Sequence, residues 1–153
     1  MKQIIDWHSH WTRKTPGFHE GRVNTYLRQF LSLFKLQPGD TIFMPLCGKA
    51  VDMLWLSEQG FNVVGVELSK VAVESFFEES RLEFVRKEAK EFTIYQAPNI
   101  TLYQGDFMHM EPQALSSCIS YSFTECGAYV RHRVDRVSVY GRQILFDKNK
   151  AGV

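Results

Sequence analysis

The sequence has few of the features that mark a disulfide-stabilised, membrane-spanning or secreted protein. Its three cysteines, Cys47, Cys118 and Cys126, are an odd number, and their spacing matches neither a disulfide framework nor a zinc site. No stretch approaches the ~18 apolar residues needed to cross a bilayer. The N-terminus lacks the unbroken apolar segment of a signal peptide. From these absences we expect a soluble protein of the reducing cytoplasm that makes no membrane contact.

Net charge is also nearly absent, and this removes any general preference for a charged partner. The chain carries 18 basic and 17 acidic side chains, so its composition gives no attraction to nucleic acid or to an anionic membrane. The balance shifts along the chain, because residues 118–153 hold 6 Lys and Arg against 3 Asp and Glu. This basic tail, with Tyr121, Tyr129 and Tyr140, leaves a nucleic-acid binder as one alternative. Six diluted basic residues are typical of an ordinary solvated surface, so we expect no nucleic-acid partner.

The sequence does have enough apolar residues for one folded core. Hydrophobic residues make up 44% and aromatic residues 14% of the 153 positions, as in a single globular domain. Apolar spacing predicts helices over residues 22–35, from residue 51 to a Gly60 cap, and after Ser69 as N-cap, and strands over residues 41–47 and 62–67. Two shorter strands are predicted over residues 91–95 and 100–103. This alternation predicts an α/β fold with a parallel sheet.

Three candidate site residues follow predicted strands, at the positions where the strands end. Gly48 lies just after the first strand, where a glycine lets the backbone approach a ligand closely. Glu67 ends the next strand, 19 positions later, where an acid can accept hydrogen bonds from ribose hydroxyls. Asp106 follows the third, where an acid can meet an adenine amino group. Because ligands of open α/β sheets bind beyond the carboxyl ends of the strands, these residues predict one shared site.

The chemistry around the glycine turn allows alternatives. A single glycine favours a nucleoside cofactor without a pyrophosphate over a dinucleotide, whose binding turn contains further glycines. The neighbouring Cys47 reads either as a nucleophile or as a small buried hydrophobe, and its position at a strand end favours the second interpretation. His8, His10 and His19 have no carboxylate or thiol at ligand spacing, so we expect no metal site.

Four blocks of the sequence resemble, in order, the signatures of the thiopurine S-methyltransferase family, especially its bacterial members. The blocks are Trp7-His8-Ser9-His10-Trp11, Gly17-Phe18-His19-Glu20, Pro45-Leu46-Cys47-Gly48-Lys49 with Asp52-Met53-Leu54-Trp55, and Val63-Val64-Gly65-Val66-Glu67-Leu68-Ser69. The resemblance implies a Rossmann-like class I methyltransferase sheet that uses S-adenosyl-L-methionine as cofactor. It also implies an aromatic, thiopurine-type thiol as the small-molecule substrate.

The resemblance further implies roles for individual residues. It implies that Trp11, Leu46 and Glu67 contact S-adenosyl-L-methionine. With the strand-end residues Gly48 and Asp106, and with Leu68 beside Glu67, these make up the expected cofactor-binding set. Phe18 and the adjoining arm are expected to fold over cofactor and substrate as a lid. The implied reaction moves a methyl group in line from the cofactor sulfonium to the substrate sulfur, which needs alignment and exclusion of water but no dedicated base. We therefore assign no catalytic residue. Without the resemblance, Trp11 and Phe18 read as core aromatics and Glu67 as a solvated strand-end acid.

The resemblance ends at about residue 117 and divides a single domain into three expected parts. Residues 1–21 are the lid arm, residues 22–117 the front half of the methyltransferase, and residues 118–153 an unmatched basic tail. The family's next strand ends in an Asp-Arg pair, which is missing from residues 117–124 of this chain. We interpret this loss as a truncated or frameshifted reading of a longer gene, with a sheet incomplete in its C-terminal half.

Two expectations follow from that interpretation. The strand at residues 41–47 would present an exposed apolar edge that promotes aggregation, because its far-side neighbours would be absent or replaced by the tail. The functional alternative to an active methyltransferase is a catalytically inactive fragment that retains at most adenosine or cofactor binding. For the oligomeric state we expect a monomer.

Overall fold

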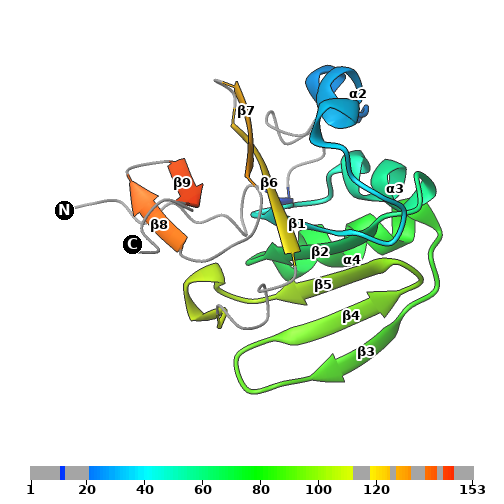
Figure 1. Cartoon of the computed structure of the whole chain (residues 1–153). Helices are drawn as coiled ribbons and strands as arrows, with labels where there is room; N and C mark the ends of the chain where they lie inside the picture. The colour runs from blue at the N-terminus through cyan, green and yellow to red at the C-terminus, as the bar shows by residue number, and fades with distance from the viewer. Residues whose placement is uncertain are drawn as a thin grey trace.

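The computed structural model describes residues 11–12 and 21–111, and four strands between residues 118 and 146 (Figure 1). Within residues 21–111, three α-helices alternate with strands. They are α2 (Thr25–Phe30), α3 (Val51–Glu58) and α4 (Lys70–Ser80). Two short 3-10 helices, η1 (Leu31–Phe34) and η2 (Phe107–His109), follow α2 and the fifth strand. None of the helices in this described part of the chain is long and apolar enough to cross a membrane.

Seven of the described strands form one mixed sheet in the order β3-β4-β5-β2-β1-β6-β7. Their bounds are β1 (Thr41–Pro45), β2 (Asn62–Glu67), β3 (Val85–Glu88), β4 (Thr93–Ala97), β5 (Ile100–Gln104), β6 (Cys118–Thr124) and β7 (Gly127–Arg131). The inner strands β5, β2, β1 and β6 are parallel, whereas β4 and β7 join them antiparallel. A separate antiparallel pair contains β8 (Val137–Tyr140) and β9 (Gln143–Phe146).

The strand order reverses at β1, which lies between β2 and β6. From β1 the chain moves through β2 to β5 on one side, and it later returns to the other side as β6. There β6 pairs with β1 from Thr41↔Cys118 to Phe43↔Ser120. This arrangement confirms the expected Rossmann-like methyltransferase sheet. The expectation of an exposed apolar edge on β1 is wrong, because a strand from the expected tail covers that edge.

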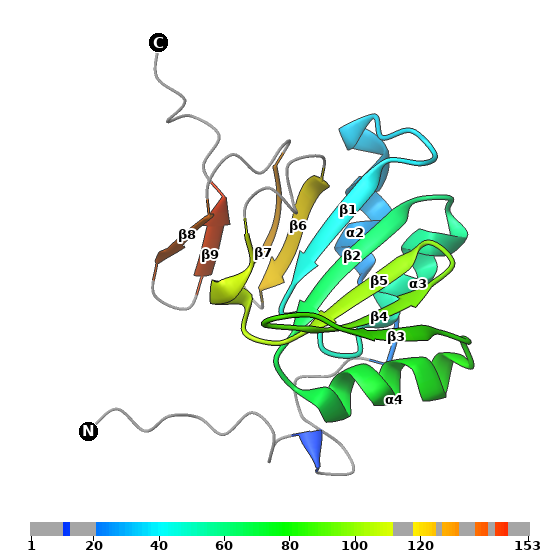
Figure 2. The same ribbon diagram turned by 90° about the horizontal axis from the view of Figure 1, so that it is seen from below.

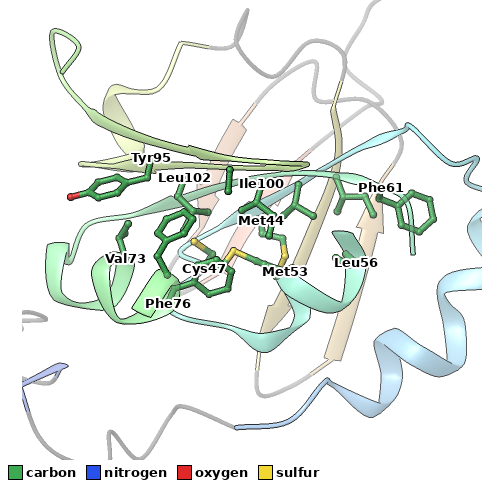
Figure 3. Packing of buried hydrophobic residues seen from close by; sticks show 14 of the residues in the cluster. Met44, Cys47, Met53, Leu56, Phe61, Val73, Phe76, Tyr95, Ile100 and Leu102 are labelled. Carbon is green, nitrogen blue, oxygen red and sulfur yellow. The ribbon is translucent and has the colours of Figure 1, made fainter. Parts of the chain in front are cut away.

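Helices α3 and α4 pack on the same face of the sheet, as two successive right-handed crossovers require (Figure 2). Figure 3 shows the core between them and the sheet. Its labelled members are Met44, Cys47, Met53, Leu56, Phe61, Val73, Phe76, Tyr95, Ile100 and Leu102. Each large apolar side chain buried in this way contributes about 1.5–3 kcal/mol. A smaller cluster of Phe43, Val66 and Phe107 forms a second buried group.

Most of the predicted elements between residues 21 and 111 are confirmed. The strands around residues 41–47 and 62–67 are β1 and β2, and the Ser69 hydroxyl caps α4 by accepting from the Ala72 N–H at 3.4 Å. The first helix is shorter than the expected residues 22–35, because α2 begins after Asn24 and tightens into η1. The edge strand β3 was not expected, since all four of its residues are exposed and show no apolar alternation.

Candidate functional site

The carboxyl ends of β1, β2 and β5 meet at one edge of the sheet and bring the predicted site residues together. The Cys47 N–H donates to the Val66 carbonyl at 3.1 Å, which joins the segment after β1 to β2. The Gly105 N–H donates to the Glu67 carbonyl at 2.9 Å, which joins β5 to the end of β2. The Gly48 turn, Glu67 at the end of β2 and the loop that carries Asp106 are therefore held side by side.

Glu67 is the centre of this edge, and its carboxylate connects two loops. Oε2 accepts a hydrogen bond from the Gly48 N–H at 2.9 Å, and Oε1 accepts one from the Ser69 N–H at 2.8 Å. The side chain is 7% exposed, so it is not the solvated strand-end acid of the simplest interpretation. A carboxylate has about four acceptor positions, so these two bonds by themselves do not exhaust its capacity.

Trp11 lies directly on the glycine turn. Gly48 is buried with φ +53°, and a Cβ added to it would lie 2.7 Å from Cζ2 and 2.8 Å from Cη2 of the Trp11 indole. The backbone conformation therefore favours glycine, and the contact with the indole requires it. The structure places three predicted site residues in one stack, with the indole above the glycine and the Glu67 carboxylate bonded to the glycine N–H.

Exposed apolar side chains follow the ends of the same strands. Leu46, directly after β1, has φ +52° and is 61% exposed, although a branched residue in the left-handed region costs roughly 1–2 kcal/mol. Strain of this kind concentrates at functional sites. Leu68 follows β2 and is 38% exposed. Met108, in η2 beyond β5, is 65% exposed and was not expected, because a lone methionine after a strand carries no sequence signal.

Asp106 lies at the predicted edge, but its carboxylate also has a local structural role. Its Oδ1 accepts a hydrogen bond from the Met108 N–H at 2.9 Å and so caps η2. The side chain is exposed beyond the end of β5. Its contact with an adenine amino group stays a prediction. Phe18, the predicted substrate residue, lies outside the described residues.

Cys47 is a core residue and not a nucleophile. Its side chain is 6% exposed and belongs to the main core beside Met53 and Leu102 (Figure 3). Burial raises the pKa of the Cys47 thiol well above its ordinary value, and the negative charge of Glu67 raises this pKa further. The reactive thiolate is therefore disfavoured.

Two further residues tie the glycine turn to its surroundings, and the sequence interpretation assigned neither a role. Lys49 Nζ donates to Glu79 Oε1 at 2.5 Å and links the turn to α4. Asp52, a buried residue in the first turn of α3, accepts the Asn24 N–H at 2.7 Å. Among the residues that the structure describes, no group of three His, Cys, Asp or Glu side chains is placed to hold a metal ion.

An open mixed sheet with parallel central strands, a glycine turn after its first strand and a buried acid ending the second fits one class, the Rossmann-like methyltransferase fold. A sequence model of that class, described as Thiopurine S-methyltransferase (TPMT), matches residues 3–123. The chain belongs to the thiopurine S-methyltransferase family. The match includes Trp11, the whole of the glycine turn and Glu67, and it extends through most of β6.

Curated relatives agree with this assignment. The thiopurine S-methyltransferase of Pseudomonas paraeruginosa is 43% identical over 115 residues, which are 75% of this chain and 53% of that protein. The Pseudomonas putida protein of the same name is 37% identical over 113 residues, 74% of this chain and 52% of its own length. A Shewanella relative is 33% identical over 138 residues, 90% of this chain and 62% of its length. The chain thus spans about half the length of the first two relatives.

Proposed function

We propose that this chain binds S-adenosyl-L-methionine at the carboxyl edge of its sheet and supports methyl transfer to the sulfur of a small aromatic thiol. One observation carries the proposal, namely the stack in which Trp11 covers Gly48 while Glu67 accepts the Gly48 N–H at 2.9 Å. The names of the relatives and the family match support the same reaction class.

The residues at the edge suit the chemical parts of this cofactor. A buried carboxylate fixed by two backbone N–H groups is preorganised to accept ribose hydroxyls, which is the role proposed for Glu67. Asp106 is proposed to meet the adenine amino group. Leu46 and Leu68 offer exposed apolar surface beside the turn, and the Trp11 ring offers a face to a cation.

The cofactor supplies an electrophilic methyl group on a sulfonium, and the chain supplies position. A thiolate is a strong nucleophile, so the rate depends on bringing the two sulfur atoms into line and on excluding water. Phe18 is proposed to contact the flat substrate. Cys47 takes no part in this reaction, because its thiol is buried and its pKa is raised by that burial.

A second candidate function is cofactor binding without catalysis. It is favoured by the absence of an Asp-Arg pair from residues 117–124. In this case Glu67 and the glycine turn still bind the nucleoside, but the substrate pocket does not close.

Calorimetric titration with S-adenosylhomocysteine tests the proposal on the purified chain. We expect saturable binding by the unaltered protein, a loss of at least tenfold in affinity in Glu67→Ala, and no change in Glu88→Ala, whose carboxylate is exposed on the edge strand. A methyl-transfer assay with thiophenol then separates the two candidates. Binding with turnover supports the methyltransferase, binding without turnover supports the second candidate, and no binding by folded protein contradicts both.

A further inference from the structure

Asp52 is a buried carboxylate that the proposed methyl transfer does not use. It lies in the first turn of α3, four positions after Gly48, where the helix dipole favours an anion. Its Oδ1 accepts the Asn24 N–H at 2.7 Å, across 28 positions of the sequence. A bond over this distance fixes two separate parts of the chain to each other.

Asn24 immediately precedes α2. Its Oδ1 accepts the Leu27 N–H at 3.4 Å and its carbonyl accepts the Arg28 N–H at 3.2 Å, so it caps the helix. The bond from its own N–H to Asp52 therefore holds the start of α2 against the start of α3. The two helix N-termini meet next to the glycine turn.

Trp11 contacts the same turn at a second place. It is 13 positions before Asn24 in the sequence, and its indole lies on Gly48. Gly48 and Asp52 are themselves only four positions apart. The Gly48 turn is therefore held between the Trp11 indole on one side and the start of α3 on the other, and the start of α3 is fixed to Asn24 through Asp52.

We propose that Asp52 is a positioning residue for the cofactor site, which acts by anchoring the start of α3 to Asn24 and thereby keeping the Gly48 turn in place against Trp11. The inference rests on the proposed function, in which the Trp11 face borders the cofactor. Asp52 touches neither cofactor nor substrate in this scheme. Its effect on cofactor affinity passes through the Trp11 indole. Removal of Asp52 should therefore weaken binding only when Trp11 is present, whereas a general structural role would weaken binding in either case.

A double-mutant cycle on the full chain tests this dependence on Trp11. Asp52→Ala removes the acceptor and is expected to weaken S-adenosylhomocysteine binding about tenfold, a coupling of the size usual for contacting groups. In a Trp11→Ala background the same change is expected to have no further effect on affinity. Asp52→Asn keeps an acceptor oxygen and is expected to bind within about twofold of the unaltered chain.

A second readout is independent of the cofactor. The chain has three tryptophans, so Trp7→Phe with Trp55→Phe leaves Trp11 as the sole reporter. Acrylamide quenching of Trp11 fluorescence is expected to rise in Asp52→Ala and to stay unchanged in Asp52→Asn. If Asp52→Ala does not fold, Asp52→Ser replaces it, because the serine hydroxyl is too short to reach the Asn24 N–H.

Asp40→Ala is the matched control. Asp40 also accepts a backbone N–H, from Gln37 at 2.8 Å, but it precedes β1 at the opposite end of the strand. An equal loss of affinity in Asp52→Ala with and without Trp11, an unchanged affinity, or an unchanged quenching overturns the inference. If the unaltered chain binds no S-adenosylhomocysteine, the proposed function fails, and the quenching experiment still decides whether Asp52 keeps the Gly48 turn against Trp11.

Discussion

The Glu67 carboxylate accepts the N–H of Gly48 at 2.9 Å and so closes the ends of β1 and β2 into one unit. Its other oxygen accepts the Ser69 N–H at 2.8 Å, at the start of α4. A single side chain thus sets the relative position of a glycine turn and a helix N-terminus. The proposed ribose contact would use a group that the fold itself has already fixed.

Removal of this carboxylate is expected to destabilise the fold as well as the site. In Glu67→Ala two N–H donors lose a buried acceptor, and we expect the free energy of unfolding to fall by about 2–4 kcal/mol. In Glu67→Gln one acceptor oxygen remains, so the loss should be smaller. Urea unfolding followed by circular dichroism measures both. Glu88→Ala removes a surface ion pair with Arg86 and should lower the free energy of unfolding by no more than about 1 kcal/mol. If Glu67→Ala lowers it by no more than Glu88→Ala does, the two hydrogen bonds of Glu67 do not stabilise the fold.

Gly48→Ala is expected to disturb the site through two causes that can be separated. The new Cβ would lie 2.7 Å from the Trp11 ring, and φ +53° is costly for alanine. We expect a loss of about 2–3 kcal/mol in stability, with about 1 kcal/mol from the backbone. The remainder comes from the displaced indole, and displacement of the indole should weaken S-adenosylhomocysteine binding.

Gly39→Ala supplies the control for the backbone cause. Gly39 has φ +92°, and an added Cβ would meet nothing within 4 Å. It should show strain without loss of binding. In a Trp11→Ala background, Gly48→Ala should lose only the stability that the backbone cause accounts for, because no indole is left to displace. If both glycine variants lose the same stability and neither loses binding, the contact between Trp11 and Gly48 does not shape the site.

The strand ends were predictable from the sequence because local patterns determine them. A continuous apolar run followed by glycine placed the turn at Gly48, and the next such run ended at Glu67. The contacts that organise the site were not predictable in the same way. Nothing local to Asp52 indicates Asn24, 28 positions away, as its partner, and nothing local to Trp11 indicates its position on Gly48.

The pairing of the strand at residues 118–124 was also not predictable from local sequence. The sequence interpretation matched nothing in residues 118–124 to the family, yet the family model extends to residue 123 and this segment pairs with β1 as β6. Whether a segment forms a parallel strand depends on a neighbouring strand elsewhere in the chain with free backbone hydrogen-bonding groups. The composition of the segment alone therefore does not predict the pairing. The division of the chain at residue 117 stays a prediction.

The Cys47 thiol is expected to make stability depend on pH in the alkaline range. Its pKa in the folded protein is raised by burial and then by Glu67, so the unfolded chain loses this proton first, near pH 8.5. The stabilising contribution is complete below that value and is lost as the pH rises through the folded pKa. We expect the free energy of unfolding to fall with a slope of up to about 1.4 kcal/mol per pH unit.

Urea unfolding between pH 7 and pH 10 measures this slope in a chain whose other thiols are removed by Cys118→Ser and Cys126→Ser. Cys47→Ala in the same background should flatten it. Native Cys47 should also react slowly with a disulfide reagent until the chain unfolds. A slope that persists without Cys47 would assign the effect to other groups, and rapid native reaction would contradict the burial of the thiol.

Gly65→Ala is expected to overpack the core directly beneath the site. Gly65 lies in the middle of β2, and an added Cβ would lie 2.6 Å from Leu102 Cδ2 and 2.8 Å from Cys47 Sγ. Overpacking of this kind costs about 1–3 kcal/mol, and it should appear as a lower urea midpoint. Gly21→Ala, where nothing lies within 4 Å of the added Cβ, should change stability by less than about 0.5 kcal/mol.

The same substitution also tests whether the core supports the turn. Because Cys47 directly precedes Gly48, pressure on its sulfur should move the turn, and Gly65→Ala should weaken S-adenosylhomocysteine binding in protein that is still folded. Gly65→Ala combined with Cys47→Ala relieves one of the two contacts, so it should recover part of the affinity and part of the stability. If stability falls and affinity does not change, the core absorbs the extra methyl at Leu102, and Glu67 by itself holds the turn in place.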